Sequence, residues 1–137
     1  MKPKLYLLLL VPLVMFASCT KWTVDTPASG IVGSWRIAYV ERQTSYGSQP
    51  ENTGYENGTF YFSSGGNAEY SDHIGDMSGS WRIVQRSGGN SLELRLYDYY
   101  GDGAIEWEFY SVEISGNRMI GYMTRYGYDY RFEFRRY

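Results

Sequence analysis

The stretch RSGGNSLELRLYDYYGDGAIEWEF, residues 86–109, decides the fold class. Leu92, Leu94 and Leu96 alternate with polar or charged residues, which is the pattern of a strand with one buried face. The turns before and after this strand contain Gly-Gly-Asn and Gly-Asp-Gly, and glycine supplies the positive φ that tight hairpin turns require. The stretch therefore predicts antiparallel strands joined by short hairpins.

The same two-residue period extends in both directions from this stretch. In the segment 104–114 the apolar side chains change face near Phe109, which predicts a bulge or a strong bend. Residues 43–57 have no period and are rich in turn-forming residues, so we expect one long loop there. We predict eight strands, at residues 33–42, 58–63, 68–72, 78–86, 91–99, 104–114, 118–125 and 129–137.

Short connections force sequential strands to pair, and closure removes both exposed edges of a sheet. We therefore predict an all-β fold: an eight-stranded antiparallel up-and-down meander that closes into a barrel. A barrel of this size is filled by side chains or holds one small ligand. In the first strand we expect Trp35, Ile37 and Tyr39 to share one face. The predicted core residues are Trp35, Trp81, Trp107, Phe60, Phe62, Leu94, Phe132 and Phe134.

The pentapeptide GSWRI occurs twice, at residues 33–37 and 79–83. The two copies diverge immediately afterwards, and the turns that follow them have different lengths. A true duplication would preserve that spacing. We interpret the repeat as one structural solution used at two strand starts, with glycine at a bend and the tryptophan directed inward.

The N-terminal residues have the order of a secretory signal. A basic MKPK precedes an apolar run at residues 5–16 and the small pair Ala17-Ser18. The run is shorter than the roughly twenty residues that a membrane span needs, although an uncleaved signal anchor is the alternative. Residues 16–19 resemble the lipobox of bacterial lipoproteins, which implies that Cys19 carries lipid. We predict a signal peptide at residues 1–18, a tether at 19–30 and the domain at 31–137.

The charge balance argues against nucleic acid as a partner. The chain has 13 Lys and Arg against 15 Asp and Glu, and cleavage before Cys19 would remove Lys2 and Lys4. An acidic surface without a basic run repels phosphate backbones. The partner that we expect is instead the membrane, through the lipid. Thr20 follows the cysteine where an aspartate would signal retention, so by resemblance to enterobacterial sorting we expect the outer membrane, with its periplasmic or surface face undecided.

Few residues offer catalytic or metal-binding chemistry. His73 is the only histidine, and its neighbours in sequence would point to alternating faces of a strand, so no catalytic triad is expected. The stretch from Asp98 to Gly103 begins like a calcium loop, but Tyr100 and Phe109 occupy positions that require oxygen ligands. We therefore expect no metal, no cofactor and no catalytic residue.

Glu106 and Glu108 share one strand face, as a pair of catalytic carboxylates would. Ile105, Trp107 and Phe109 occupy the other face, so the glutamates are expected to face water. A hydrolase that uses this pair would need both residues in a cleft. It is the least favoured of the functions considered.

Gly33-Ser34-Trp35 resembles the Gly-x-Trp motif of the lipocalins. Residues 31–137 resemble the lipocalin-like lipoproteins of Bacteroidetes-type bacteria in length, in glycine and aromatic content, and in the lipobox that precedes them. The resemblance implies that Trp35 plugs the closed end of a barrel against an arginine of the last strand. The candidate partners are Arg131, Arg135 and Arg136.

The chain contains 15 tyrosines, more aromatic residues than a core of this size requires. Tyrosine combines an apolar ring with a polar tip and suits a ligand cavity, carbohydrate stacking or an interface. The alternative is that these tyrosines serve only cross-strand pairing on the outer surface of the sheet. We expect a non-enzymatic, lipid-anchored envelope protein that binds a small apolar or amphipathic ligand at the open end of the barrel. The alternative is a filled barrel that contacts an envelope protein or a glycan through surface tyrosines. The candidate contact residues are Tyr39, Tyr97, Tyr99, Tyr122, Tyr126 and Tyr130.

Overall fold

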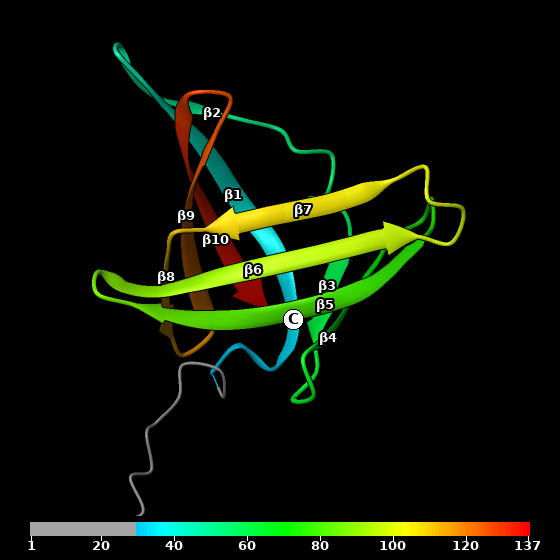
Figure 1. The fold of residues 1–137 in the computed structure, drawn as a ribbon. Coiled ribbons are helices and arrows are strands. Elements are labelled where there is room, and N and C mark those ends of the chain that lie inside the picture. Colours follow the sequence, from blue (N-terminus) through cyan, green and yellow to red (C-terminus); the bar gives the residue numbers. More distant parts are fainter. Residues whose placement is uncertain (1–29) are drawn as a thin grey trace, which may run out of the picture.

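The computed structural model describes residues 30–137, which form one antiparallel sheet (Figure 1). The predicted all-β class is confirmed. The predicted signal peptide, Cys19 and the tether up to residue 29 lie outside the described residues. The strands are β1 Gly33–Thr44, β2 Gly47–Pro50, β3 Thr59–Phe62, β4 Asn67–Ser71, β5 Asp76–Arg86, β6 Gly89–Asp98, β7 Ala104–Phe109, β8 Ser111–Ser115, β9 Arg118–Arg125 and β10 Tyr128–Arg136.

The strands follow the order β7-β6-β5-β4-β3-β1-β10-β9-β8, and β2 pairs with β1 beside this path. Strands that are consecutive in the sequence pair along most of the sheet, which is the predicted meander, and the first strand pairs with the last. In Figure 1, β5, β6 and β7 lie in front and run across β1, β9 and β10. The side chains between these two layers form the core.

The prediction of eight strands is wrong, and the first reason is β2. This strand lies inside the predicted loop at residues 43–57 and pairs with the end of β1. The Thr44 hydroxyl donates to the Gly47 carbonyl oxygen at 2.8 Å and fixes the turn. All four residues of β2 are exposed. A strand without a buried face has no apolar alternation, so the sequence carries no periodic signal for it.

The second reason is a break at Tyr110, which divides the predicted strand 104–114 into β7 and β8. The bend predicted near Phe109 is confirmed. β7 pairs with β6, whereas β8 pairs with β9, and the Tyr110 amide donates to the Tyr122 carbonyl oxygen at 2.8 Å. β7 and β8 are therefore the two edges of the sheet. Because they do not pair with each other, the sheet is not closed, and the predicted closed barrel is wrong.

A bulge in β1 corrects the prediction for Tyr39. Ile37 pairs with Phe134 and Tyr39 pairs with the adjacent Glu133, so Ala38 is an extra residue on its strand. A bulge reverses the side on which the following residues point. Val40 is consequently buried and Tyr39 is 41% exposed, so Tyr39 does not share the inward face of Trp35.

Aromatic rings fill the space between the layers. Trp107 of β7 has its ring centroid 5.6 Å from that of Phe60, 5.1 Å from that of Phe132 and 6.0 Å from that of Phe109. These distances are typical of packed aromatic pairs. All eight predicted core residues are buried: Trp35, Trp81, Trp107, Phe60, Phe62, Leu94, Phe132 and Phe134.

Both GSWRI tryptophans have structural roles. The Trp35 indole Nε1 donates to the Ile31 carbonyl oxygen at 2.7 Å, and the Trp81 Nε1 donates to that of Ser63 at 2.9 Å. Gly33 has a φ of 126°, which favours glycine. At Gly79 a Cβ atom would collide with the backbone oxygen of the neighbouring strand. Both copies therefore place a glycine where a side chain is excluded and bury a hydrogen-bonded indole.

The start of the domain is fastened to its last strand by Arg136. Its guanidinium carbon lies 4.5 Å from the Trp35 ring centroid, the contact that the resemblance assigned to one of three arginines. Its two terminal nitrogens donate to the carbonyl oxygens of Val32 and Gly30 at 2.8 and 2.7 Å. Ile31 is fully buried. This end of the sheet is thus covered by its own N-terminal residues.

Candidate functional site

The candidate site is a hollow of about 460 Å³ at one end of the sheet, which we call the large hollow. It is lined by the segment between β2 and β3 and by the β4–β5 and β6–β7 turns. The two turns are on the right of Figure 1. A volume of this size falls within the range of small-molecule sites. The lining residues are Gly54, Tyr55, Tyr70, Asp72, Ile74, Gly75, Asp76, Met77, Asp98, Tyr99 and Tyr100.

Two aspartates build the turns that border the large hollow. Asp72 Oδ1 accepts hydrogen bonds from the Ile74 and Gly75 amides at 2.7 and 3.0 Å. Asp98 accepts bonds from the two amides at positions 102 and 103, both at 2.9 Å. Side chains of this type stabilise turns by bonding to the backbone ahead of them. The stretch that resembled a calcium loop therefore uses its first carboxylate to form a hairpin turn.

Tyr70 joins the large hollow to the core. It is buried, and its ring centroid lies 4.8 Å from that of Phe60. Its hydroxyl donates to Asp72 Oδ2 at 2.8 Å. Burial is the main cause that raises the pKa of Tyr70, and the adjacent Asp72 carboxylate raises it further. The phenol consequently stays protonated and keeps donating to Asp72 at physiological pH.

The segment at residues 51–58, which we call the strap, carries Tyr55 across this end of the sheet. The Tyr55 ring packs edge-on against Tyr70 at 5.3 Å and against Trp107 at 5.6 Å between centroids. At Gly58 a Cβ atom would collide with the Tyr70 ring, so glycine is required where the strap enters β3. Tyr55 therefore covers the aromatic core from outside.

Glu56 pins the strap. Its Oε1 accepts bonds from the Thr53 amide and hydroxyl at 2.6 and 2.8 Å, and its Oε2 accepts one from the Gly54 amide at 3.0 Å. Partial burial raises the pKa of Glu56, but the hydrogen bonds from Thr53 and Gly54 together outweigh it and leave the pKa below its ordinary value. The ionised carboxylate thus holds the strap in place.

A second hollow of about 210 Å³, the small hollow, lies on the other side of Tyr55. Tyr55 lines both hollows and separates them. Arg125 lies at its rim, with its guanidinium carbon 4.9 Å from the Tyr126 ring centroid. The lining residues are Glu51, Asn52, Thr53, Tyr55, Trp107, Met123, Arg125, Tyr126, Tyr130 and Phe132. The small hollow therefore combines apolar side chains with one arginine and one glutamate.

Two tyrosines and an isoleucine that line the large hollow are largely exposed to solvent. Tyr99 and Tyr100 in the β6–β7 turn are 92% and 83% exposed, and Ile74 in the β4–β5 turn is also exposed. The two tyrosine rings pack edge-to-face at 5.2 Å. Exposed apolar groups that gather around a concavity are a feature of binding sites.

The six predicted contact tyrosines occupy three places. Tyr99 lines the large hollow, and Tyr126 and Tyr130 line the small one. The other three, Tyr39, Tyr97 and Tyr122, do not line either hollow. Tyr97 is on an exposed face, where its hydroxyl donates to Glu106 Oε1 at 2.6 Å.

Of the residues that line the large hollow, sequence reasoning named only Tyr99 as a contact. The residues that it missed include Tyr55, Tyr70, Asp76 and Met77. Tyr70 stands at an alternating position in a predicted strand, which places it inward but gives no sign of its contact with Asp72. Tyr55 lies in the segment without a period, so no local pattern could place it.

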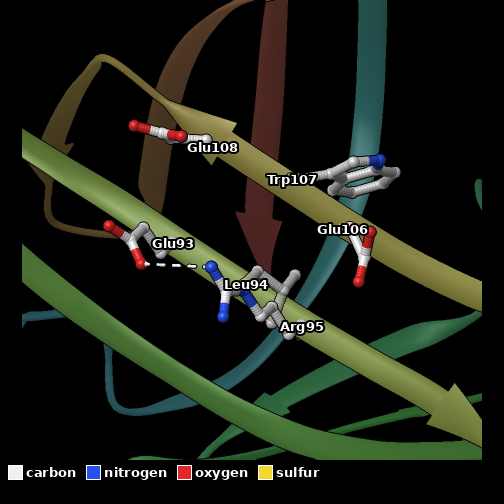
Figure 2. Close-up of a pocket in the computed structure, with 6 residues that line it drawn as sticks. All are labelled: Glu93, Leu94, Arg95, Glu106, Trp107 and Glu108. Carbon is white, nitrogen blue, oxygen red and sulfur yellow. Dashed lines mark ion pairs between the residues drawn. The ribbon is translucent and has the colours of Figure 1, made fainter.

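A shallow hollow of about 170 Å³ lies over β6 and β7 and contains both Glu106 and Glu108 (Figure 2). Both glutamates are exposed, and Glu108 accepts a hydrogen bond from Arg86 at 3.0 Å. A catalytic carboxylate pair needs unlike environments, one of which keeps a proton on its acid. Glu106 accepts from the neutral Tyr97 hydroxyl and Glu108 pairs with the Arg86 guanidinium, but both carboxylates are exposed and neither lies in the apolar, enclosed environment of a carboxyl that acts as an acid, so their geometry gives no support to the hydrolase hypothesis. The shallow hollow is lined by Glu93, Leu94, Arg95, Glu106, Trp107 and Glu108.

Within residues 30–137, no group of three or more His, Cys, Asp or Glu side chains could hold a metal ion. His73 is exposed in the β4–β5 turn. In the same part of the chain, no helix has the length and apolar character needed to cross a membrane. Comparisons with family models, with curated proteins and with solved structures found no match.

We predict that Glu56→Gln loosens the strap at neutral pH. The Gln side chain loses the charge that strengthens its bonds to the amides of Thr53 and Gly54. Hydrogen exchange at these two amides should become about fivefold faster than in the unaltered chain at the same pH.

Acid should likewise loosen the strap in the unaltered chain. The pKa of Glu56 is lowered in the folded state, so its contribution is complete above about 4.5, the ordinary value, and is lost as the pH falls through the lower folded value. Equal exchange rates in the variant and the unaltered chain at neutral pH would show that Glu56 does not hold the strap.

Proposed function

We propose that the protein is a non-enzymatic, lipid-anchored protein of the cell envelope, attached to the outer membrane, that binds a small amphipathic ligand in the large hollow. The observation that carries the proposal is this hollow, which has a volume of about 460 Å³ and is bordered by four tyrosine rings. The rings belong to Tyr55, Tyr70, Tyr99 and Tyr100.

The lining favours a ligand with an apolar body and a polar end. Tyrosine rings and the Met77 side chain offer apolar contact, while tyrosine hydroxyls and aspartate carboxylates offer hydrogen bonds. Small-molecule sites combine these two features in the same way, with a few polar groups that set orientation. Tyr99 and Tyr100 project freely and can close over such a molecule.

The packed interior supports binding at the end of the sheet rather than inside it. Trp107, Phe109 and Phe132 pack against one another between the layers. A ligand inside would have to displace these rings, each of which loses favourable contacts when a neighbour moves away. The large hollow offers apolar contact without that cost.

The anchor is supported by the sequence ahead of the described residues. The basic, apolar and small segments precede Cys19 in the order of a lipoprotein signal. A single lipid-modified residue anchors a protein stably in a membrane when the residue carries more than one acyl chain. Arg136 ties Gly30 and Val32 to the last strand, so the tether would leave the fold from a fixed point.

A second candidate function is contact with an envelope protein or a glycan through tyrosines outside the hollows. Tyr110 and Tyr122 support it, because their rings stack with centroids 6.4 Å apart and Tyr110 is half exposed. Tyr39 and Tyr97 are similarly exposed. Tyrosine is enriched at the centres of protein interfaces.

Binding can be tested with 2-phenylethanol, a small neutral amphipathic molecule. Saturation-transfer NMR on the full chain in a nonionic detergent should show binding. The double variant Tyr99→Ala/Tyr100→Ala should weaken it about fivefold or more, because two aromatic contacts are lost.

Tyr46→Ala is the matched control, since Tyr46 is 95% exposed in the β1–β2 turn and does not line the hollow. Its affinity should equal that of the unaltered chain. Absence of binding, or equal affinity in the double variant, would contradict the proposed site. Loss of binding in Tyr110→Ala instead would favour the second candidate function.

The anchor has its own test. Cys19→Ala removes the sulfur that lipid would occupy, so the protein should leave the outer-membrane fraction, and the lipid mass found on the unaltered chain should disappear. An unaltered chain that keeps residues 1–18 and lacks the lipid mass would instead establish the signal anchor.

A further inference from the structure

We propose that the ligand of the large hollow is an organic cation, with an alkylammonium or guanidinium group attached to an apolar body. This inference rests on the proposed function, because it names the chemical class that the same hollow selects. It is carried by the combination of unshielded tyrosine rings with a lining that has carboxylates and no arginine or lysine.

The aromatic part of the lining suits a cation. The face of an aromatic ring is negative and attracts ammonium or guanidinium groups that approach within about 6 Å of its centroid. Tyr99 and Tyr100 contact each other edge-to-face and are otherwise largely free in water. Tyr55 packs edge-on against Tyr70 in the body of the hollow. The exposed rings of Tyr99 and Tyr100 are therefore the ones that can contact a cation in the hollow.

The charges around the hollow have one sign. Asp72, Asp76 and Asp98 line it. All of its lining residues come from two stretches, residues 43–81 and 96–117, and each stretch has five acidic residues and no lysine or arginine. His73 in the β4–β5 turn is the one histidine in either stretch, and it is exposed.

The three aspartates differ in their hydrogen bonding. Hydrogen bonds hold the pKa of Asp72 below its ordinary value, first from the Ile74 amide and then from the Tyr70 hydroxyl. Asp98 uses both of its carboxylate oxygens to accept the amides of its own turn. Among the described residues, Asp76 makes no side-chain hydrogen bond or ion pair, and it is exposed. It is therefore available to pair directly with a ligand.

The small hollow provides a contrast within the same molecule. Its rim includes Arg125, which would repel a cation, although Glu51 also lies in its lining. An amphipathic anion such as a fatty acid would be repelled by the three aspartates of the large hollow. Charge therefore distinguishes the two hollows on either side of Tyr55.

Three molecules with the same phenylethyl body test the inference on the full chain in nonionic detergent. They are 2-phenylethylamine, which is an ammonium ion at pH 7, neutral 2-phenylethanol, and the anion 3-phenylpropanoate. We expect the ammonium to bind about five- to thirtyfold more tightly than the alcohol, from its cation–π and ionic contacts, and the anion to bind most weakly. Added salt should reduce the preference.

Asp76→Asn should reduce the preference for the ammonium over the alcohol about threefold, because the ammonium loses an ionic contact that the neutral alcohol does not make. Glu113→Gln removes an equal charge from β8, outside the lining, and should leave both affinities unchanged. Both positions are exposed, so neither change threatens the fold.

The outcomes separate this inference from the proposed function. Equal binding of ammonium and alcohol, or tighter binding of 3-phenylpropanoate, would overturn the cation preference and leave the proposed function standing. Failure of all three molecules to bind would overturn the proposed function and this inference with it. If Glu113→Gln abolished the preference for the ammonium and Asp76→Asn left it unchanged, the assignment to the large hollow would be overturned.

Discussion

The packing of Trp107 is the interaction on which the rest of the structure depends. Its ring contacts Phe60 of β3, Phe132 of β10 and Tyr55 of the strap, and so joins both layers of the sheet to the segment that covers its end. Aromatic pairs of this kind contribute about 0.5 to 1.5 kcal/mol each beyond the area that they bury. The same ring occupies the middle of the fold, which is why ligand binding is assigned to the end of the sheet.

The bend at Tyr110 explains how a sheet with two free edges still encloses a core. The chain leaves β7 at one edge and begins β8 at the other, and β6 lies close to β8 while β7 lies close to β9. Glu106 and Glu108 place charges along β7. Charged side chains on an edge strand discourage pairing with another chain. The fold therefore surrounds its aromatic core without hydrogen bonds between its edges.

The sequence predicted the parts of the fold that have a period of two. The leucines of β6 and the phenylalanines of β10 show it clearly, because one face of each strand is buried. The period fails at β2, whose residues are all exposed, and at Ala38, where one extra residue reverses the pattern. Neither feature leaves a local signal, since both depend on how β1 pairs with its neighbours.

The candidate site was harder to predict from the sequence than the core. The tyrosine content led to the prediction of a binding surface, and the predicted contact residues included Tyr99. Tyr55, Tyr70 and the aspartates line one hollow because the strap and two turns meet there, and they meet only in the folded chain. The acidic character of residues 43–81 and 96–117 is visible in the sequence, but its meaning depends on both stretches lining one hollow.

Methyl NMR of methionine can locate the ligand, because the methionines lie at different places in the fold. Met77 lines the large hollow, Met123 lines the small one, and Met119 is buried in the core. With the methionine methyl groups labelled with carbon-13, 2-phenylethylamine should shift the signal of Met77 and leave those of Met119 and Met123 in place. A shift at Met123 or Met119 with Met77 unmoved would place the ligand elsewhere and contradict the account.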